Sequence, residues 1–352
     1  MAFPKVSVIF KGVAANAIQR GNRGVVALIL KDTSAGVHHI ESASDIPSLN
    51  ATNKKYIEDA FIGGQSAPKK VIAVVIGTAS SDYTSALKTL ETLTFDYLAV
   101  PGISTSDVQS IAGWVKTQRD NKRRKIKAVL PKCAGDHEGI INFATDNIVV
   151  GSNTYTASKY TARIAGLLAG TPMNASVTFF TLPEVDDVPA LTDEEKDTAV
   201  DRGELIIVND GRKCKIARGV NSLVSTSENK PEEFKKIKLI DILDLLADDI
   251  RFTAEDNYIG KVTNNYDNTC VLITAINGYF EELEGQNLLA KGYNKCEYDL
   301  DAKIAYLKSV NRYDESMKEH EIKALPSADK VFLKASIRPL DVMEDIVVNI
   351  SL

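Results

Sequence analysis

The chain has 352 residues, a formal net charge of −5, 44% apolar residues and 25% charged residues. These values are typical of a globular protein with more than one domain, and they exclude a disordered chain and a strongly basic, nucleic-acid-binding protein. The longest apolar runs, VVALIL and VIAVVI, are much too short to span a bilayer.

The N-terminal segment, residues 1–24, alternates weakly at Val6, Val8 and Phe10 before it reaches GNRG. Two interpretations remain open: an extended arm that docks elsewhere, or an ordinary first strand followed by a loop. The segment lacks the long apolar stretch and cleavage site of a signal peptide. We therefore expect synthesis in the cytoplasm, without export and without a membrane partner.

Residues 25–80 contain strand-like apolar runs and one short helix around KKYIEDAF, which predicts a small β-rich domain. From residue 81 to residue 245, helical and buried-strand patterns alternate, as in an α/β domain with a parallel sheet. Within it, Ser104 with Asp107 and Thr192 with Glu195 have the spacing of capping boxes. Gly166 and Gly170 lie four residues apart in a predicted helix, where a neighbour could approach closely.

The same α/β segment contains a predicted hairpin around Asn209, Asp210 and Gly211. Residues 246–340 then read as an α+β domain. A long helical pattern covers PEEFKKIKLIDILDLLADDIRF, and a second apolar stripe follows at Leu272, Ala275, Ile276, Tyr279, Phe280 and Leu283. Strand-like pieces KCEYDL and KVFLKASIRPL complete this domain.

The last segment, residues 341–352, ends in an alternating strand pattern with no polar tail. Its four apolar positions on one face are Ile346, Val348, Ile350 and Leu352. An unpaired strand edge is normally covered, so this strand has a partner. The partner is either the sheet of its own domain, which the stretch alone favours, or another subunit.

Motifs that would carry catalysis are not found in the sequence. GxxxxGK[ST], GxSxG and HExxH do not occur, and the glycine pairs lack dinucleotide-binding spacing. The cysteines and histidines are dispersed, so we expect neither a metal site nor a cofactor. They are Cys133, Cys214, Cys270, Cys296, His38, His39, His137 and His320.

Clusters of charge are better explained by solvation or ion pairing than by chemistry. The basic run NKRRKIK, residues 121–127, is best interpreted as a solvated helix end. A contact with another subunit is the second interpretation, and a contact with nucleic acid is the third. Carboxylates such as Asp248, Asp249 and Asp256 have nearby cations. A soluble α/β enzyme with a carboxylate-lined pocket stays as the alternative function.

Four stretches together resemble the tail sheath proteins of contractile bacteriophage tails and phage-tail-like bacteriocins. They are YTARIAGLLAGTPMNASVTFFTLPEVDDV, LTDEEKDTAVDRGELIIVNDGRKCKIARGVNSLVS, IKLIDILDLLADDIRFTAEDNYIGKVTNNYDN and KVFLKASIRPLDVMEDIVVNISL. The resemblance implies a structural subunit and not an enzyme. It implies stacked hexameric rings around a tail tube, baseplate and tail terminator partners, and contraction without nucleotide hydrolysis that drives the tube through a cell envelope. It also implies assembly in the bacterial host cytoplasm, as part of a virion tail or released particle.

The resemblance also assigns roles to residues. Both chain ends become arms that add strands to neighbouring subunits: Val6, Val8 and Phe10 in one, and Ile346, Val348, Ile350 and Leu352 in the other. Gly21, Gly24 and Pro339 become the arm hinges. The polar helix start at Glu232, Lys235, Lys236 and Lys238 becomes the candidate tube contact, with an ordinary solvated helix face as an equal alternative.

Overall fold

The computed structural model describes residues 23–351. This part of the chain divides into two compact units: residues 23–248 with 341–351 form the α/β unit, and residues 249–340 form the C-terminal unit. Within residues 23–351 the chain passes between the units twice, within helix α6 (Ile237–Asn257) and at Leu340–Asp341. The sequence placed the corresponding boundaries after residues 245 and 340.

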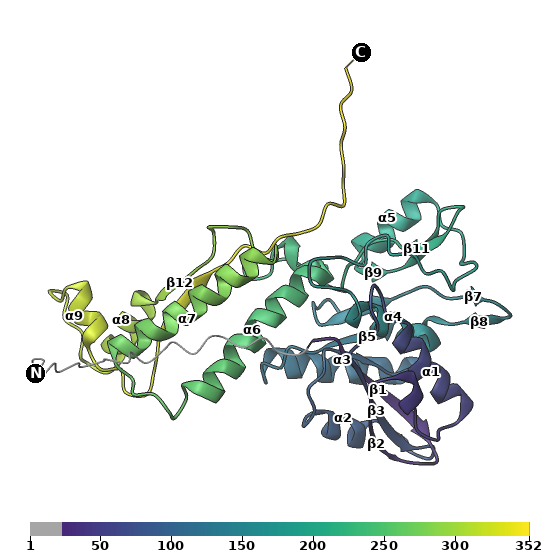
Figure 1. Ribbon diagram of the computed structural model, residues 1–352, viewed down its shortest axis with the longest axis horizontal. Helices are drawn as coiled ribbons and strands as arrows, with labels where there is room; N and C mark the ends of the chain where they lie inside the picture. The colour runs from purple at the N-terminus through teal and green to yellow at the C-terminus, as the bar shows by residue number, and fades with distance from the viewer. Residues whose placement is uncertain (1–22, 352) are drawn as a thin grey trace, which may run out of the picture. The chain divides into compact units, whose positions relative to one another are not determined.

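A seven-stranded sheet forms the centre of the α/β unit (Figure 1), and its strand order is β2-β3-β1-β4-β5-β6-β9. All neighbouring pairs are parallel except β2 with β3. The strands are β1 (Val25–Asp32), β2 (Gly36–Ile40), β3 (Lys70–Gly77), β4 (Tyr97–Ala99), β5 (Lys127–Pro131), β6 (Ile140–Phe143) and β9 (Glu204–Leu205). The architecture confirms the predicted α/β fold.

The small β-rich domain expected over residues 25–80 is not a separate domain. Strand β1 lies between β3 and β4, so that Val26 is paired with both Val71 and Tyr97. Local patterns showed short strands joined by polar loops, but the pairing of β1 with β4 joins residues about seventy positions apart, which no local pattern shows. Strands on both sides of residue 80 therefore share one core.

Helices cover both faces of the sheet. Side chains of β1 alternate between them: Val26, Leu28 and Leu30 face one core, and Ala27 and Ile29 face the other. The first core includes α1 (Ala51–Ile62) and α4 (Ala157–Ala169), and the second includes α2 (Thr84–Leu90) and α3 (Thr105–Asp120). Burial on both faces explains why the central strands read as continuous apolar runs.

Helices α1 and α4 approach closely through glycine, as predicted. A Cβ atom on Gly166 would lie 2.0 Å from the carbonyl oxygen of Ala60, and one on Gly170 would lie 2.0 Å from that of Ser66. Real Cβ atoms do not approach backbone so closely, so any larger residue would force the helices apart.

Further local predictions can be compared with the α/β unit. The Thr192–Glu195 capping box opens α5 (Asp193–Asp201), and the predicted hairpin joins β10 (Ile207–Asn209) to β11 (Cys214–Ile216) with Gly211 at φ 84°. The capping box predicted at Ser104 is wrong, because its hydroxyl donates to the Asp107 carboxylate and caps no backbone N–H. The remaining elements are η1 (Ala43–Asp45), β7 (Ile148–Val150), β8 (Asn153–Tyr155) and η2 (Glu232–Lys235).

The C-terminal unit combines helices with one small antiparallel sheet. Its core includes the predicted stripe of α7 (Tyr266–Gly285), where Ala275, Ile276, Tyr279, Phe280 and Leu283 are buried. Its other elements are β12 (Lys295–Tyr298), α8 (Leu300–Ser309), α9 (Glu319–Ala324) and β13 (Leu333–Ser336), with β12 paired to β13. Among residues 23–351, no helix is both long and apolar enough to cross a membrane.

Candidate assembly surfaces

Helix α6 enters the α/β unit with three aspartates on one face. Asp241, Asp244 and Asp248 are spaced three and four residues apart, which places them one above the other on a helix. The Asp244 residue is only 2% exposed. A buried carboxylate needs a partner, and the sheet supplies cations to it.

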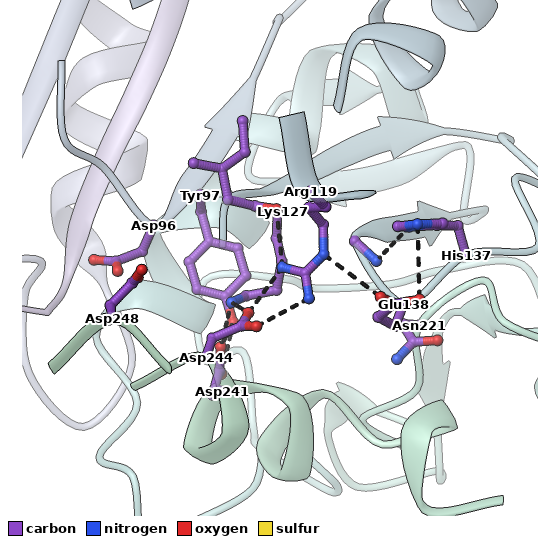
Figure 2. Close-up of polar contacts among 12 residues, drawn as sticks. Asp96, Tyr97, Arg119, Lys127, His137, Glu138, Asn221, Asp241, Asp244 and Asp248 are labelled. Carbon is purple, nitrogen blue, oxygen red and sulfur yellow. Dashed lines mark hydrogen bonds and ion pairs between the residues drawn. The ribbon is translucent and has the colours of Figure 1, made fainter. Parts of the chain in front are cut away.

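Two cations from the sheet side meet this face (Figure 2). Arg119, at the end of α3, binds Asp244 through two parallel hydrogen bonds of 2.9 Å each. Lys127, in β5, is completely buried, and its Nζ lies 2.8 Å from Asp241 and 2.7 Å from Asp244. Tyr97 of β4 completes the group by donating its hydroxyl to Asp241 at 2.7 Å.

The charges of this ionic cluster stabilise one another. Burial alone would raise the pKa of Asp244, but Arg119 and Lys127 outweigh it and hold that pKa well below its usual range. Burial likewise opposes the charge on Lys127, yet Asp241 and Asp244 raise its pKa above the ordinary value. These groups therefore stay ionised, and the cluster joins α6 to the sheet as a set of matched charges.

A second ion pair fixes the start of the described chain. Arg23 contacts Asp96 at 2.9 Å and Asp248 at 3.0 Å. The other Asp96 oxygen accepts the backbone N–H groups of Gly24 and Val25. Gly24 was predicted as a hinge; here its backbone is at φ 96° and hydrogen-bonded to the Asp96 carboxylate.

One neighbouring group has the composition of a metal site. Asp120, His137 and Glu138 each offer an atom, all within 4.8 Å of one another. However, Glu138 already contacts Lys230 at 2.9 Å and Arg119 at 3.7 Å. With two cations at this carboxylate, the group belongs to the ion-pair network, and it gives no support for a metal.

This ionic cluster was not predicted from the sequence. The basic run that includes Lys127 was expected to be solvated, whereas Lys127 is buried in β5. The contact of Asp248 with Arg23 was not predicted. The sequence nevertheless contains an indication of the cluster in β5 and another in α6. Lys127 lies inside the apolar strand pattern KIKAVLP, and the three aspartates share one face of an otherwise apolar helix. Paired signals of this kind predict a buried ion pair between the two elements.

Of the candidate tube-contact residues, Glu232 and Lys235 lie in η2, and Lys236 and Lys238 lie at its junction with α6. The latter two are not free on the surface. Lys236 pairs with Asp341 and Glu344, and Lys238 is 6% exposed. Glu232 and Lys235 form a pair of 2.9 Å, in which the Glu232 side chain is 73% exposed. Of the four residues, Glu232 is the exposed one, since the Lys235 side chain is 28% exposed and that of Lys236 is 29% exposed.

Residues 346–351 leave the α/β unit as an extended segment without secondary structure (Figure 1). Ile346, Val348 and Ile350 are 75%, 71% and 80% exposed. The interpretation of this strand as an edge of its own sheet is therefore wrong for the described residues, because no strand of this chain pairs with them. The remaining arm and hinge residues, Val6, Val8, Phe10, Gly21 and Leu352, lie outside the described residues, and Pro339 lies in the C-terminal unit, opposite Leu289.

A cavity of about 640 Å³ beside α5 is the best match in the described chain for the carboxylate-lined pocket of the enzyme alternative. Glu194, Glu195 and Glu204 line it. Glu195 is committed to the capping box of α5, where its carboxylate accepts the backbone N–H of Thr192. Nothing in this cavity pairs a nucleophile with a base, so no observation favours catalysis there.

Comparisons with known proteins agree with this architecture. A family model described as the phage tail sheath protein central domain matches residues 77–222, and the phage tail sheath C-terminal domain matches residues 229–352. The tail sheath protein of Clostridium phage phiCD119 is 37% identical over 352 residues, covering 99% of this chain and 98% of that protein.

Solved structures show the same fold. A sheath tail protein from Desulfitobacterium hafniense has a TM-score of 0.70 at 18% identity, over 84% of this chain and 94% of that one. A chain of the anti-feeding prophage baseplate, solved by cryo-electron microscopy, has a TM-score of 0.69 at 15% identity, over 100% and 99%. With both sheath domains matched and a sheath protein aligned along nearly its whole length, this chain belongs to the phage tail sheath protein family.

Proposed function

We propose that this sheath subunit polymerises as a helical stack of hexameric rings around a tail tube and that terminal arms join the subunits by strand exchange. One observation carries the proposal: an apolar, alternating segment is exposed in its own subunit. Segment 346–351 has four large apolar side chains that are each more than 70% exposed, and three of them, Ile346, Val348 and Ile350, alternate along the chain. Exposed alternating strands are the usual donors in β-augmentation.

The energetics explain why such arms act together. Four apolar side chains at about 2 kcal/mol each contribute on the order of 8 kcal/mol, while ordering ten residues at about 1 kcal/mol each costs a similar amount. A single arm therefore binds weakly. Two arms on every subunit of a repeating lattice bind strongly, because each contact raises the effective concentration for the next one.

The small sheet of the C-terminal unit is the best acceptor in the described chain. A two-stranded sheet is only marginally stable, so a further strand would benefit it. The outer edge of β12 is occupied at Cys296, whose backbone N–H and C=O both bond to the side-chain amide of Asn277. In this register the backbone N–H and C=O groups of Leu333 and Ala335 in β13 point away from β12, and within residues 23–351 no backbone hydrogen bond closes that edge. We assign β13 as the receiving edge.

Contraction in this proposal needs no nucleotide and no catalysis by the sheath. Assembly traps an extended lattice of higher free energy, which relaxes by forming new contacts between subunits. The tail tube, baseplate and tail terminator proteins are the expected partners, and assembly in the host cytoplasm precedes incorporation into a tail or tail-like particle. The pair Glu232–Lys235 remains the candidate contact with the tube, since it is polar and its Glu232 side chain is 73% exposed.

The test is electron microscopy of the full-length protein over a concentration series, beside a variant that lacks residues 346–352. We expect tubes or stacked rings from the full chain and dispersed, folded subunits from the truncated one. The double variant Ile346→Asn with Val348→Asn should also fail to assemble, whereas Val347→Asn with Asn349→Asp, on the opposite strand face, should assemble. Normal tubes from the truncated protein would refute strand donation by this arm.

A further inference from the structure

A short acidic segment, residues 341–345, separates the C-terminal unit from the exposed arm. Most of it lies on the surface, and Met343 is 92% exposed. The side chain of Glu344 is the exception, since only 6% of it is exposed. A carboxylate this deeply covered between exposed neighbours indicates a specific binding site for it on the α/β unit.

Three donors surround the Glu344 carboxylate. The Thr178 hydroxyl donates to one oxygen at 2.6 Å, and Arg218 Nε and Lys236 Nζ donate to the other at 3.1 Å and 3.0 Å. Both oxygens are therefore satisfied, by groups that come from separate loops of one unit. Hydrogen bonds to an ionised group are among the stronger ones in proteins.

The Thr178 hydroxyl is oriented toward Glu344 by its own surroundings. It accepts the backbone N–H of Gly219 at 2.9 Å, which leaves its proton for the carboxylate. Burial would raise the pKa of Glu344, but the hydrogen bonds from Thr178 and Lys236 outweigh burial and lower it. The site thus holds the charged form of Glu344 at neutral pH.

Both cations also hold the flanking acids. Arg218 contacts Asp345 at 2.8 Å, and Lys236 contacts Asp341. Each cation therefore joins Glu344 to one end of the segment. Beyond Asp345 these contacts stop, and the exposed arm begins.

We propose that Glu344 anchors the C-terminal arm to its own subunit, so that the arm pivots between Asp345 and Ile346 and not at Pro339. This inference rests on the proposed strand donation. The chain around Pro339 is itself held in the C-terminal unit, because Arg338 accepts a backbone hydrogen bond from Ala290 and Leu340 donates one to Leu288, each at 2.9 Å. Anchoring residues 341–345 shortens the free arm, and this reduces the conformational entropy that is lost when the arm pairs with a neighbour.

The test uses nitroxide spin labels on the dispersed full-length protein, in a Cys270→Ser background because the other three cysteines are buried. One label replaces Met343 and the other replaces Val348. We expect slow motion at residue 343, fast motion at residue 348, and fast motion at both once Glu344→Gln is introduced. Thr178→Val should act in the same direction. Asp193→Asn is the matched control, because it removes the same charge from a side chain that is 94% exposed and pairs with Lys196, outside the anchor.

The same variants are then compared for the critical concentration of assembly, measured by sedimentation. Glu344→Gln should raise it about tenfold, the effect of weakening one charge-assisted hydrogen bond, and Asp193→Asn should change it little. Equal label motion at residues 343 and 348 in the parent protein would overturn the anchor. Free motion in Glu344→Gln with an unchanged critical concentration would overturn its role in assembly. If removal of residues 346–352 leaves assembly intact, the proposed function fails, and the labels still decide separately whether Glu344 is anchored.

Discussion

At the scale of residues, the molecule is organised by charges that are buried in pairs. Lys127 is completely covered in the sheet, yet its Nζ meets Asp241 and Asp244 of α6 within 2.8 Å. Each charge is acceptable there only because the others are present, since an unpaired buried ion is strongly unfavourable. The cluster therefore specifies where α6 docks more than it adds net stability.

Asp244→Asn should lower the free energy of unfolding of the α/β unit by about 3 kcal/mol, because it leaves Arg119 and Lys127 buried without their shared carboxylate. Chemical denaturation followed by circular dichroism measures the difference. Asp193→Asn is the matched control: that side chain is 94% exposed and pairs only with Lys196, so the expected change is below about 1 kcal/mol. Equal losses in the two variants would contradict the cluster's role.

The pH dependence follows from the same residue. The pKa of Asp244 is lower in the folded protein than in the unfolded chain, so its contribution is present above the unfolded value and is lost as pH falls toward the folded value. Stability of the parent protein should therefore decline below about pH 4, and Asp244→Asn should decline less steeply.

At the scale of elements, the contact between α1 and α4 depends on the absence of side chains. Gly166→Ala should destabilise the protein by about 1–3 kcal/mol, since the new methyl group would overlap the Ala60 carbonyl. Gly278→Ala in α7 is the control, because nothing lies within 4 Å of its added Cβ, and helix propensity predicts a gain of up to about 1 kcal/mol. Thermal unfolding separates these outcomes, and a stabilised Gly166→Ala would be incompatible with the close approach.

Elements with strong local signals could be predicted from the sequence. The Thr192 capping box, the Gly211 hairpin and the apolar stripe of α7 depend on neighbours in the chain, and all three are confirmed. The place of β1 beside β4 and the ion pairs of Lys127 depend on residues far apart in sequence, where period and propensity carry no information. The terminal strand was predicted from its alternating apolar residues, but this alternation does not indicate which strand it pairs with.

At the scale of the whole molecule, the large apolar side chains that are most exposed within residues 23–351 lie close together in the last ten of them, from Met343 to Ile350. Elastase, which cuts after small aliphatic residues, should remove the end of the chain after Val347 or Val348 in dispersed protein, because both side chains are more than 70% exposed. In assembled tubes the same bonds should resist, since backbone paired in a sheet is inaccessible to a protease. Intact-mass spectrometry follows the cleavage, and equally fast trimming in both states would argue against a paired arm.

The acidic segment at residues 341–345 also determines how tension travels through a subunit. A neighbour that pulls on the arm loads Glu344 and its three donors before any force reaches β13, because the anchor lies between them along the chain. The α/β unit would then bear the pull, and the small sheet that we propose as the acceptor of a neighbour's strand would be spared from the strain on its own chain. A sheath built this way could transmit force from subunit to subunit without unzipping the strand pairs that hold it together.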